Sequence, residues 1–517
     1  MNAALTQLKS PLQRGLLQVA VMMATIMQAV DTTIANVALP HMQGSMSATQ
    51  DQMSWVLTSY IVTAAIMIPP TAAIASRIGH KRLFLISVGG FTVASMLCGL
   101  ATSLSQIIVF RMLQGAFGAA LVPLSQTILL NMYPKEKHGK AMTIWSIGVM
   151  LGPILGPTLG GYLTEFYNWR WVFFINLPLG LFALVGMISL LPESDLEKPR
   201  KFDFLGFALL SLAIGALQLM LDRGESQNWF SSPEIITEAI LALVFFYMFI
   251  VQMFTVDHPF LDRRIFQDRN FVIGLMFLFY VGILLLATMA LMPPFLQNLM
   301  GYPVLYVGYL LAPRGLGTMI GLILTGRLTA KLDPRILILA GQLIIAFSLW
   351  EMAGFTLEVS SSTIIWTGIV QGVGMGFIIV PLNTAAFATL DHKLRTEGTS
   401  IANLVRNIGS SIGISVLITM LARGTQENHA VLAENITPFR AAFFQPSLPL
   451  NWEWHFESGV VALNAEVTKQ AATIAYLNDF YFLMILTILA APLVLLLNRN
   501  DKQPAPDTAE TAELLID

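Results

Sequence analysis

The sequence is poor in charge and contains a single cysteine. Charged residues make up 12% of the 517 residues, whereas 55% are hydrophobic and the mean hydropathy is +0.68. Soluble domains carry about 25% charged residues, so this composition excludes an ordinary soluble domain and indicates an integral membrane protein. The one cysteine, Cys98, excludes an intrachain disulfide.

Motifs for nucleotides, metals and covalent chemistry are also missing. The sequence has no GxxxxGK[ST] loop, no spaced cluster of metal ligands and no nucleophile constellation. We therefore expect neither an enzyme nor an ATP-driven pump, and no cofactor, metal or nucleic acid. The net charge of −2 says little about partners, because the positions of the charges matter more in a membrane protein.

Long apolar segments recur along the whole chain. A bilayer core needs about 20 apolar residues per helix, and the alternating pattern of a β-barrel is absent, so a helical bundle is predicted. We predict fourteen transmembrane helices, at residues 15–40, 52–76, 82–103, 105–132, 139–165, 169–191, 202–222, 234–256, 270–297, 303–330, 335–356, 362–388, 396–422 and 476–498.

The positive charges between these helices predict the orientation. Most of the 29 lysines and arginines lie in the tails and in the connections from even-numbered to odd-numbered helices. Such connections face the cytoplasm under the positive-inside rule. Both termini are therefore predicted to be cytoplasmic, with tails at 1–14 and 499–517, and the second tail is polar and predicted to be disordered.

Two parts of the chain repeat each other. MLQGAFGAALVPLSQTILLNMYP at 112–134 parallels IVQGVGMGFIIVPLNTAAFATLD at 369–391, an offset of about 257 residues. Parallel repeats are typical of transporters that rock two halves about a central site. We predict two six-helix halves, at 15–191 and 257–498, separated by a linker and two inserted helices at 192–256. The second half includes a long external loop at 423–475.

Five stretches of the sequence are distinctive: VDTTIANVALP (30–40), FRMLQGAFGAALVPLSQ (110–126), GVMLGPILGPTLGGYL (148–163), NWRWVFFINLPLG (168–180) and LQLMLDRGESQNWFSSPEI (217–235). In these stretches the chain resembles the fourteen-helix drug:proton antiporters of the EmrB type in the major facilitator superfamily. The resemblance implies an all-α integral membrane protein with the major facilitator fold, its helices arranged 6 + 2 + 6. It also implies multidrug efflux, and with it antibiotic resistance.

Asp31 is a carboxylate inside an apolar span. It lies about 24 Å into the first helix at 1.5 Å per residue, and Arg111, early in the fourth helix, reaches a similar depth. Intramembrane ionisable residues are costly and usually functional. In the family, helices 1 and 4 adjoin and this arginine belongs to a motif associated with proton transfer. We predict that Asp31 and Arg111 couple transport to protons or that Asp31 binds a cationic substrate; a fixed ion pair is the alternative.

Glycines recur at every fourth position of the predicted fifth helix. The motif comprises Gly148, Gly152, Pro153, Gly156, Pro157, Gly160 and Gly161. The spacing places the glycines on one face and lets another helix approach closely. In the exporters that this helix resembles, the pattern bends the helix and seals the face between the halves. We predict a conformational motif, with tight packing as the simpler alternative.

The basic loop SRIGHKR between the second and third helices is a candidate gate. It matches the loop of the superfamily in part, with Ala72 where glycine is usual and Ser76 where aspartate is usual. The other residues of interest are Arg77, Gly79, Lys81 and Arg82. They either gate the cytoplasmic side or only fix the topology.

Polar residues near the middle of the membrane form the predicted substrate cavity. They are Gln28, Asn36, Gln114, Arg314, Gln371, Asn383 and Arg406. We identify no acidic residue in the second half at the depth of Arg314 and Arg406. Three roles are open for these arginines: they face the cavity, bind an acidic substrate group or donate to helix carbonyls. Their presence keeps both amphipathic and weakly acidic substrates in consideration.

The leading prediction is a proton-coupled exporter of amphipathic drugs or toxic compounds across the bacterial inner membrane. The resemblance implies lipid, protons and small-molecule substrates as partners, and a periplasmic adaptor that leads to an outer-membrane channel, with the external loop as a docking surface. One alternative is a dedicated exporter of one metabolite, such as a siderophore or a fatty acid. A remote alternative is a membrane receptor or scaffold that does not transport.

Overall fold

The computed structural model describes residues 11–48, 50–133, 138–193, 202–329, 332–391, 394–434, 436 and 457–497. Every regular element in these ranges is helical. The amino-terminal half contains α2 (Pro11–Met46), α3 (Gln50–Met67), α4 (Thr71–Ile78), α5 (His80–Leu100), α6 (Leu104–Gly118), α7 (Leu121–Met132), α8 (His138–Phe166), α9 (Trp171–Phe174) and α10 (Asn176–Leu190).

An insert and a second half follow. The insert consists of α11 (Phe204–Arg223), η2 (Trp229–Ser231) and α12 (Pro233–Thr255). The carboxy-terminal half contains η3 (Arg263–Gln267), α13 (Arg269–Pro294), η4 (Phe295–Leu299), α14 (Val304–Leu328), α15 (Pro334–Met352), α16 (Ser361–Ala388), α17 (Arg395–Glu434), α18 (Glu457–Ala490) and η8 (Ala491–Leu496). The predicted tail 499–517 and most of the tail 1–14 lie outside the described residues.

The all-helical membrane fold is confirmed. Each predicted span coincides with one helix or with two consecutive helices. In the described residues twelve helices are long and apolar enough to cross a bilayer, or thirteen if the pair Trp55–Met67 and Thr71–Ile78 is one span bent by 58°. Pro69 and Pro70 lie at this bend, where proline removes backbone donors. Because α8 contributes only a shorter apolar stretch, Ala141–Gly152, the count of fourteen stays a prediction.

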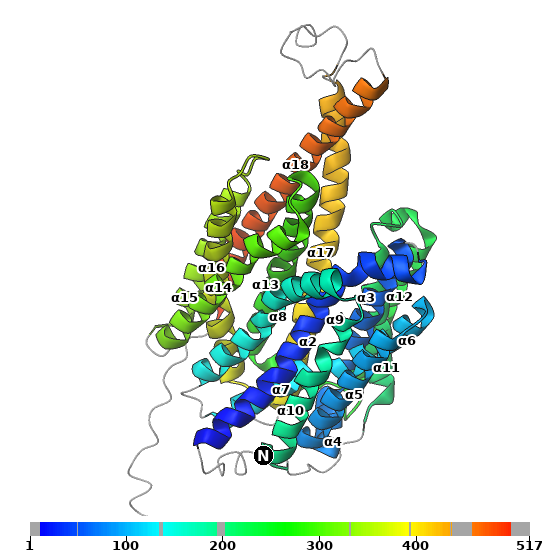
Figure 1. Ribbon diagram of the computed structural model, residues 1–517. Helices are drawn as coiled ribbons and strands as arrows, with labels where there is room; N and C mark the ends of the chain where they lie inside the picture. Colours follow the sequence, from blue (N-terminus) through cyan, green and yellow to red (C-terminus); the bar gives the residue numbers. More distant parts are fainter. Residues whose placement is uncertain are drawn as a thin grey trace, which may run out of the picture.

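The predicted loop at 423–475 needs correction. Helix α17 continues to Glu434 and α18 begins at Glu457, so the two helices take up both ends of that segment. The 40 residues of α17 correspond to about 60 Å, roughly twice the 30 Å hydrocarbon core. Figure 1 shows α17 and α18 projecting as a hairpin beyond the other helices. Trp452 and Trp454 lie outside the described residues.

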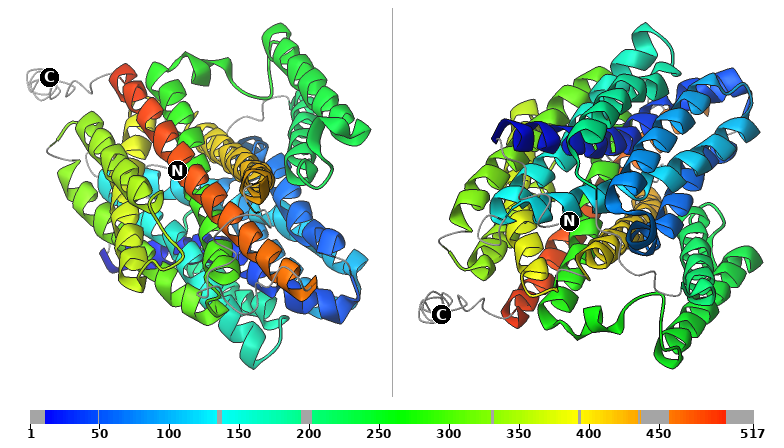
Figure 2. Two further views of the ribbon diagram at one scale, coloured as in Figure 1. Left: turned by 90° about the horizontal axis from the view of Figure 1, so that it is seen from above. Right: turned by 90° about the horizontal axis from the view of Figure 1, so that it is seen from below.

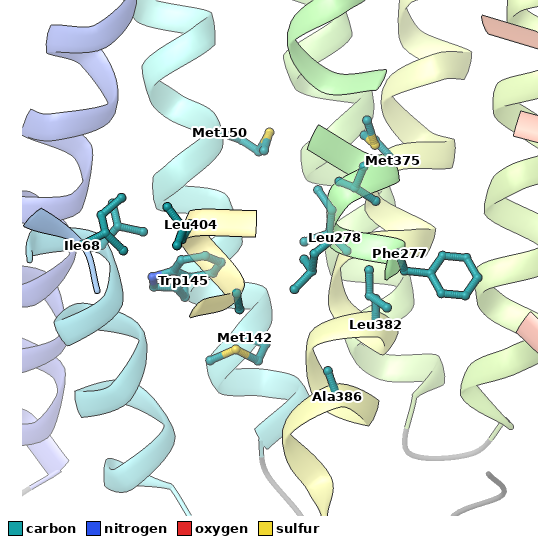
Figure 3. Close-up of a cluster of buried hydrophobic side chains, with 14 of the residues drawn as sticks. Ile68, Met142, Trp145, Met150, Phe277, Leu278, Met375, Leu382, Ala386 and Leu404 are labelled. Atoms are coloured by element: carbon teal, nitrogen blue, oxygen red, sulfur yellow. The ribbon is translucent and has the colours of Figure 1, made fainter. Parts of the chain in front are cut away.

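The two halves pack against each other through α7 and α8 on one side and α14, α16 and α17 on the other. One apolar core extends over both halves, and Figure 3 shows Trp145 of α8 beside Leu404 of α17 within it. We call the end of the bundle where α2 begins the terminal end, and the opposite end the hairpin end (Figure 1).

The insert lies at the edge of the bundle, as both views in Figure 2 show. Helix α11 contacts α3 of the first half and α17 of the second. Asp222 accepts a hydrogen bond from Thr58 on α3, and Gln218 donates to Ser411 on α17 over 2.7 Å. The inserted pair therefore touches both halves rather than belonging to one of them.

Candidate functional site

Asp31 and Arg111 form a fully buried ion pair. Asp31 on α2 is 0% exposed and Arg111 on α6 is 1% exposed. The Arg111 Nη1 atom lies 2.7 Å from the Asp31 Oδ2 atom. The structure thus brings together the two residues that the sequence placed at matching depth.

Two amides complete the surroundings of the Asp31 carboxylate. Gln114 Nε2 donates to Asp31 Oδ1 over 2.7 Å, and Asn176 Nδ2 donates to the same oxygen over 2.8 Å. Arg111 also donates through Nη1 to Gln114 Oε1 over 2.8 Å and through Nε to the Val56 carbonyl over 3.1 Å. Donors from α6 and α10 therefore compensate for the loss of water around a buried carboxylate.

Aromatic rings surround the guanidinium of Arg111. Its Cζ atom lies 4.2 Å from the ring centre of Tyr60 and 5.8 Å from that of Phe173, distances at which a cation is attracted by the ring face. Gln28, a predicted cavity residue, donates to the Tyr60 hydroxyl over 3.2 Å. Both Gln28 and Gln114 therefore belong to the surroundings of this ion pair.

Asn176 is the functional candidate that the sequence analysis missed. It lies where α9 and α10 meet, and its Nδ2 also donates to Ser95 Oγ on α5 over 2.9 Å. The available signal was an amide within the apolar stretch NWRWVFFINLPLG. The site thus joins α2, α3, α5, α6 and α10, all in the amino-terminal half.

The glycines of α8 pack against α2. A Cβ atom at Gly148, Gly152 or Gly156 would collide with Met22, Ala29 or Thr33, respectively, and the Thr33 hydroxyl donates to the Gly152 carbonyl over 3.0 Å. The predicted close helix approach is therefore present, within one half. Further along, the Thr164 hydroxyl donates to the carbonyls of Gly160 and Gly161 over 2.7 and 3.1 Å.

The resemblance implies that this motif seals the face between the two halves, and helix α8 does contact the second half. One such contact is made by Thr143, which lies next to Gly326 of α14. The conformational role of the motif stays a prediction. The side chains of Pro153 and Pro157, like that of the predicted cavity residue Asn36, are outside the described ones.

The basic residues of the predicted gate contact the amino-terminal half and the linker that follows it. Arg77 lies 5.4 Å from the ring centre of Phe202. Lys81 Nζ donates to the Ile188 carbonyl over 3.2 Å, and exposed Arg82 lies 3.9 Å from Glu193. Gly79 joins α4 to α5 with φ of 89°, a conformation that favours glycine.

His80, within the same loop, reaches the other half. Its Nε2 atom lies 2.9 Å from the Thr396 hydroxyl at the start of α17. The partial match to the superfamily pattern pointed to Arg77, Gly79, Lys81 and Arg82 and gave no reason to single out His80.

A second polar network joins the halves near the terminal end. Gln126 Nε2 on α7 donates to Asn383 Oδ1 on α16 over 3.2 Å, and Asn403 Nδ2 on α17 donates to Gln126 Oε1 over 3.3 Å. Arg406 Nη2 donates to Asn403 Oδ1 over 2.7 Å. Thr127 and Thr399 place their hydroxyl oxygens 2.9 Å apart. Two predicted cavity residues, Asn383 and Arg406, thus lie in contacts between the halves.

The remaining two predicted cavity residues lie on α14 and α16 of the carboxy-terminal half. Arg314 Nη2 donates to the Thr288 hydroxyl over 2.8 Å, and its Cβ lies beside Gly368. Gln371 is 2% exposed, and its Oε1 has no partner among the described residues. The predicted cavity residues whose side chains are described therefore occupy three places: the Asp31 site, the contacts between the halves, and helices α14 and α16 within the carboxy-terminal half.

Known proteins resemble this chain along most of its length. The sequence profile of the Major Facilitator Superfamily matches residues 21–414. The multidrug export protein EmrB of Escherichia coli (strain K12) is 37% identical over 429 residues, which are 83% of this chain and 84% of EmrB. The fatty acid resistance protein FarB of Neisseria gonorrhoeae is 35% identical over 479 residues, 91% of this chain and 94% of FarB.

Solved structures share the fold. A bacterial homolog of the human lysosomal transporter Spinster superposes with a TM-score of 0.57 at 18% sequence identity, and the match covers 94% of this chain and 97% of the homolog.

Proposed function

Because the chain belongs to the major facilitator superfamily, in the group of EmrB, we propose that it exports amphipathic drugs or toxic compounds in exchange for protons. The single observation that carries the proton coupling is the buried ion pair of Asp31 and Arg111. A carboxylate at this depth is retained at a free-energy cost that a purely apolar core would avoid.

The contacts of Asp31 indicate how its protonation changes the packing of α2. Ionised Asp31 accepts hydrogen bonds from Arg111, Gln114 and Asn176, and these hold α2 against α6 and α10. Protonation removes the negative charge that these donors stabilise, so the hold on α2 weakens. Loss of the proton restores the hydrogen bonds that hold α2. Each cycle of protonation and deprotonation therefore changes the packing of the amino-terminal half.

Vesicle transport tests this proposal. We expect a proton gradient across inverted membrane vesicles to drive uptake of a fluorescent amphipathic cation by the wild type. Asp31→Asn should reduce uptake to the level without a gradient, whereas Glu165→Gln, an exposed carboxylate on α8, should not. Gradient-driven uptake that persists in Asp31→Asn at equal expression would place coupling elsewhere and favour the fixed ion pair.

A second candidate substrate class is the amphipathic acid, such as a fatty acid. Arg314 and Arg406 donate to neutral partners, Thr288 and Asn403, and neither forms an ion pair with a carboxylate in the described part of the chain. FarB, which resembles this chain, is named for fatty acid resistance.

Adding a long-chain fatty acid to the same vesicles separates the alternatives. A dedicated fatty acid exporter moves the acid and not the cation, whereas a receptor or scaffold, like an exporter dedicated to another metabolite, moves neither.

We further propose that the chain lies in the bacterial inner membrane with both termini in the cytoplasm. The α17–α18 hairpin then reaches the periplasm, where it docks an adaptor that leads to an outer-membrane channel. Val460 and Val461 on this hairpin are 50% and 64% exposed, which suits a protein contact. Aspartates at both positions should abolish cross-linking to the adaptor in cells and leave vesicle transport intact; unchanged cross-linking would argue against this surface.

A further inference from the structure

A second acidic side chain is buried in the carboxy-terminal half. Asp479 on α18 is 1% exposed. The neighbours one turn away on the same helical face are Ala475 and Leu483, which are 1% and 0% exposed. Asp479 therefore lies on the inward face of a helix that packs against α15, α17 and η4. Counting back from Leu497 at the terminal end, it lies roughly 27 Å along the helix, within the bilayer thickness.

The carboxyl of Asp479 lacks the partners that Asp31 has. Its Oδ2 atom is buried without a hydrogen-bond partner, and no ion pair to it occurs within the described ranges. The contrast is with Asp31, which a guanidinium and two amides stabilise as a carboxylate. The two buried aspartates thus have opposite surroundings, one able to hold a charge and the other not.

The titratable groups nearest to the level of Asp479 on the elements around it do not compensate for a negative charge there. Helix α18 itself offers Tyr476, one turn away, and α13 offers Tyr280. Helix α15 carries Glu351 near its end, which is another potential negative charge. Arg423 on α17 is exposed, and η4 and η8 carry no titratable side chain. An unpaired carboxylate in such a medium is so costly that the group binds a proton instead.

We propose that Asp479 is a second proton-binding site, one that holds its proton in the arrangement seen here. It releases the proton when water enters between α18 and the helices around it. The site lies beside a broken part of α13, where Pro293 and Pro294 precede the π-helical turn η4. Phe295 of η4 contacts the ring of Tyr476, with ring centres 5.4 Å apart. Because Tyr476 lies one turn from Asp479 on α18, this irregular turn packs close to the buried carboxyl.

The inference does not depend on antiport, and infrared spectroscopy of the purified full-length protein in lipid nanodiscs tests it directly. At neutral pH we expect the wild type to show the C=O stretch of a protonated carboxyl in a hydrophobic site. This band should be lost in Asp479→Asn and retained in Asp31→Asn, Asp222→Asn and Glu351→Gln. A band that survives in Asp479→Asn, or that the wild type lacks, would overturn the proposal.

A second measurement covers the case in which Asp479→Asn does not fold. Protein that carries both Asp31→Asn and Asp222→Asn and is labelled with ¹³C-aspartate should show the band shifted to lower frequency, because the proton resides on an aspartate. An unshifted band would assign the proton to a glutamate and contradict the inference. Since no transport is measured, failure of the proposed drug export leaves this test unaffected.

Discussion

At the scale of single residues, Arg111 contributes more than a positive charge. Its Nη1 donates to Asp31 and Gln114, its Nε donates to Val56, and its plane lies near the Tyr60 ring. Lysine keeps the charge but not the planar fork of donors or the stacking.

We therefore expect Arg111→Lys to lower gradient-driven transport more than tenfold. Each lost hydrogen bond to a charged group is worth about 1.5–3 kcal/mol, and about 1.4 kcal/mol corresponds to a factor of ten. Initial uptake rates in vesicles measure the effect, with Arg264→Lys at a 70% exposed position as the control. Near-normal rates in Arg111→Lys would mean that charge alone suffices.

The residues of this site were predictable to different degrees. Asp31 and Arg111 are visible in the sequence because a charge inside an apolar run is rare and costly. Asn176 and Tyr60 carry no such signal, since a single amide or phenol in a membrane helix is compatible with many positions. Their roles depend on where α9 ends and α10 begins and on how α3 packs beside α6, which follows from the tertiary structure.

At the scale of helices, the glycines of α8 determine how closely it approaches α2. A side chain at Gly152 would collide with the backbone of Ala29, and backbone cannot move aside as a flexible side chain can. Overpacking of this kind costs about 1–3 kcal/mol.

We expect Gly152→Val to lower the thermal unfolding temperature of the detergent-purified protein by several degrees. Gly89→Ala on α5 is the matched control, because a Cβ there meets nothing within 4 Å; it should unfold at the wild-type temperature or slightly above. Equal unfolding temperatures for Gly152→Val and the wild type would show that α8 and α2 do not need this close contact.

Hydropathy located the helices but not their ends at the hairpin. The apolar pattern of α17 stops near the membrane boundary, so this pattern predicts a loop beyond residue 422. The helix continues because it pairs with α18: Asn428 Nδ2 donates to the Ala471 carbonyl over 3.5 Å, and His429 Nε2 lies 3.0 Å from Asn464 Oδ1. Contacts between helices far apart in sequence are not visible in a hydropathy pattern.

At the scale of the molecule, the internal repeat predicted two related halves, and α7 and α16 of these halves meet at nearly equivalent positions. Gln126 follows V-P-L-S in the first copy and Asn383 follows V-P-L in the second, and these two side chains hydrogen-bond each other. The repeat alone could not indicate which end of the two halves would be in contact. In this structure the polar contacts of α7 with α16 and α17 lie toward the terminal end.

If transport proceeds by rocking of the two halves, these terminal-end contacts must separate during each cycle. Thr127 and Thr399 are suited to test this, because their hydroxyl oxygens are 2.9 Å apart and sulfurs at these positions lie within reach of the ~2.05 Å disulfide bond. Cys98 is the only native cysteine, so a Cys98→Ala background contains no competing thiol. In that background, Thr127→Cys combined with Thr399→Cys should transport when reduced and stop when oxidised.

The single-cysteine variants control for oxidation itself and should transport under both conditions. Mass spectrometry of the digested protein confirms that the disulfide has formed, and a reductant should then restore uptake. A fully cross-linked protein that still transports would show that the two halves do not separate between α7 and α17. Transport would then depend on movement elsewhere in the protein. Protonation of Asp31 would still weaken the α2 contacts, but this weakening would have to drive transport without opening the terminal end.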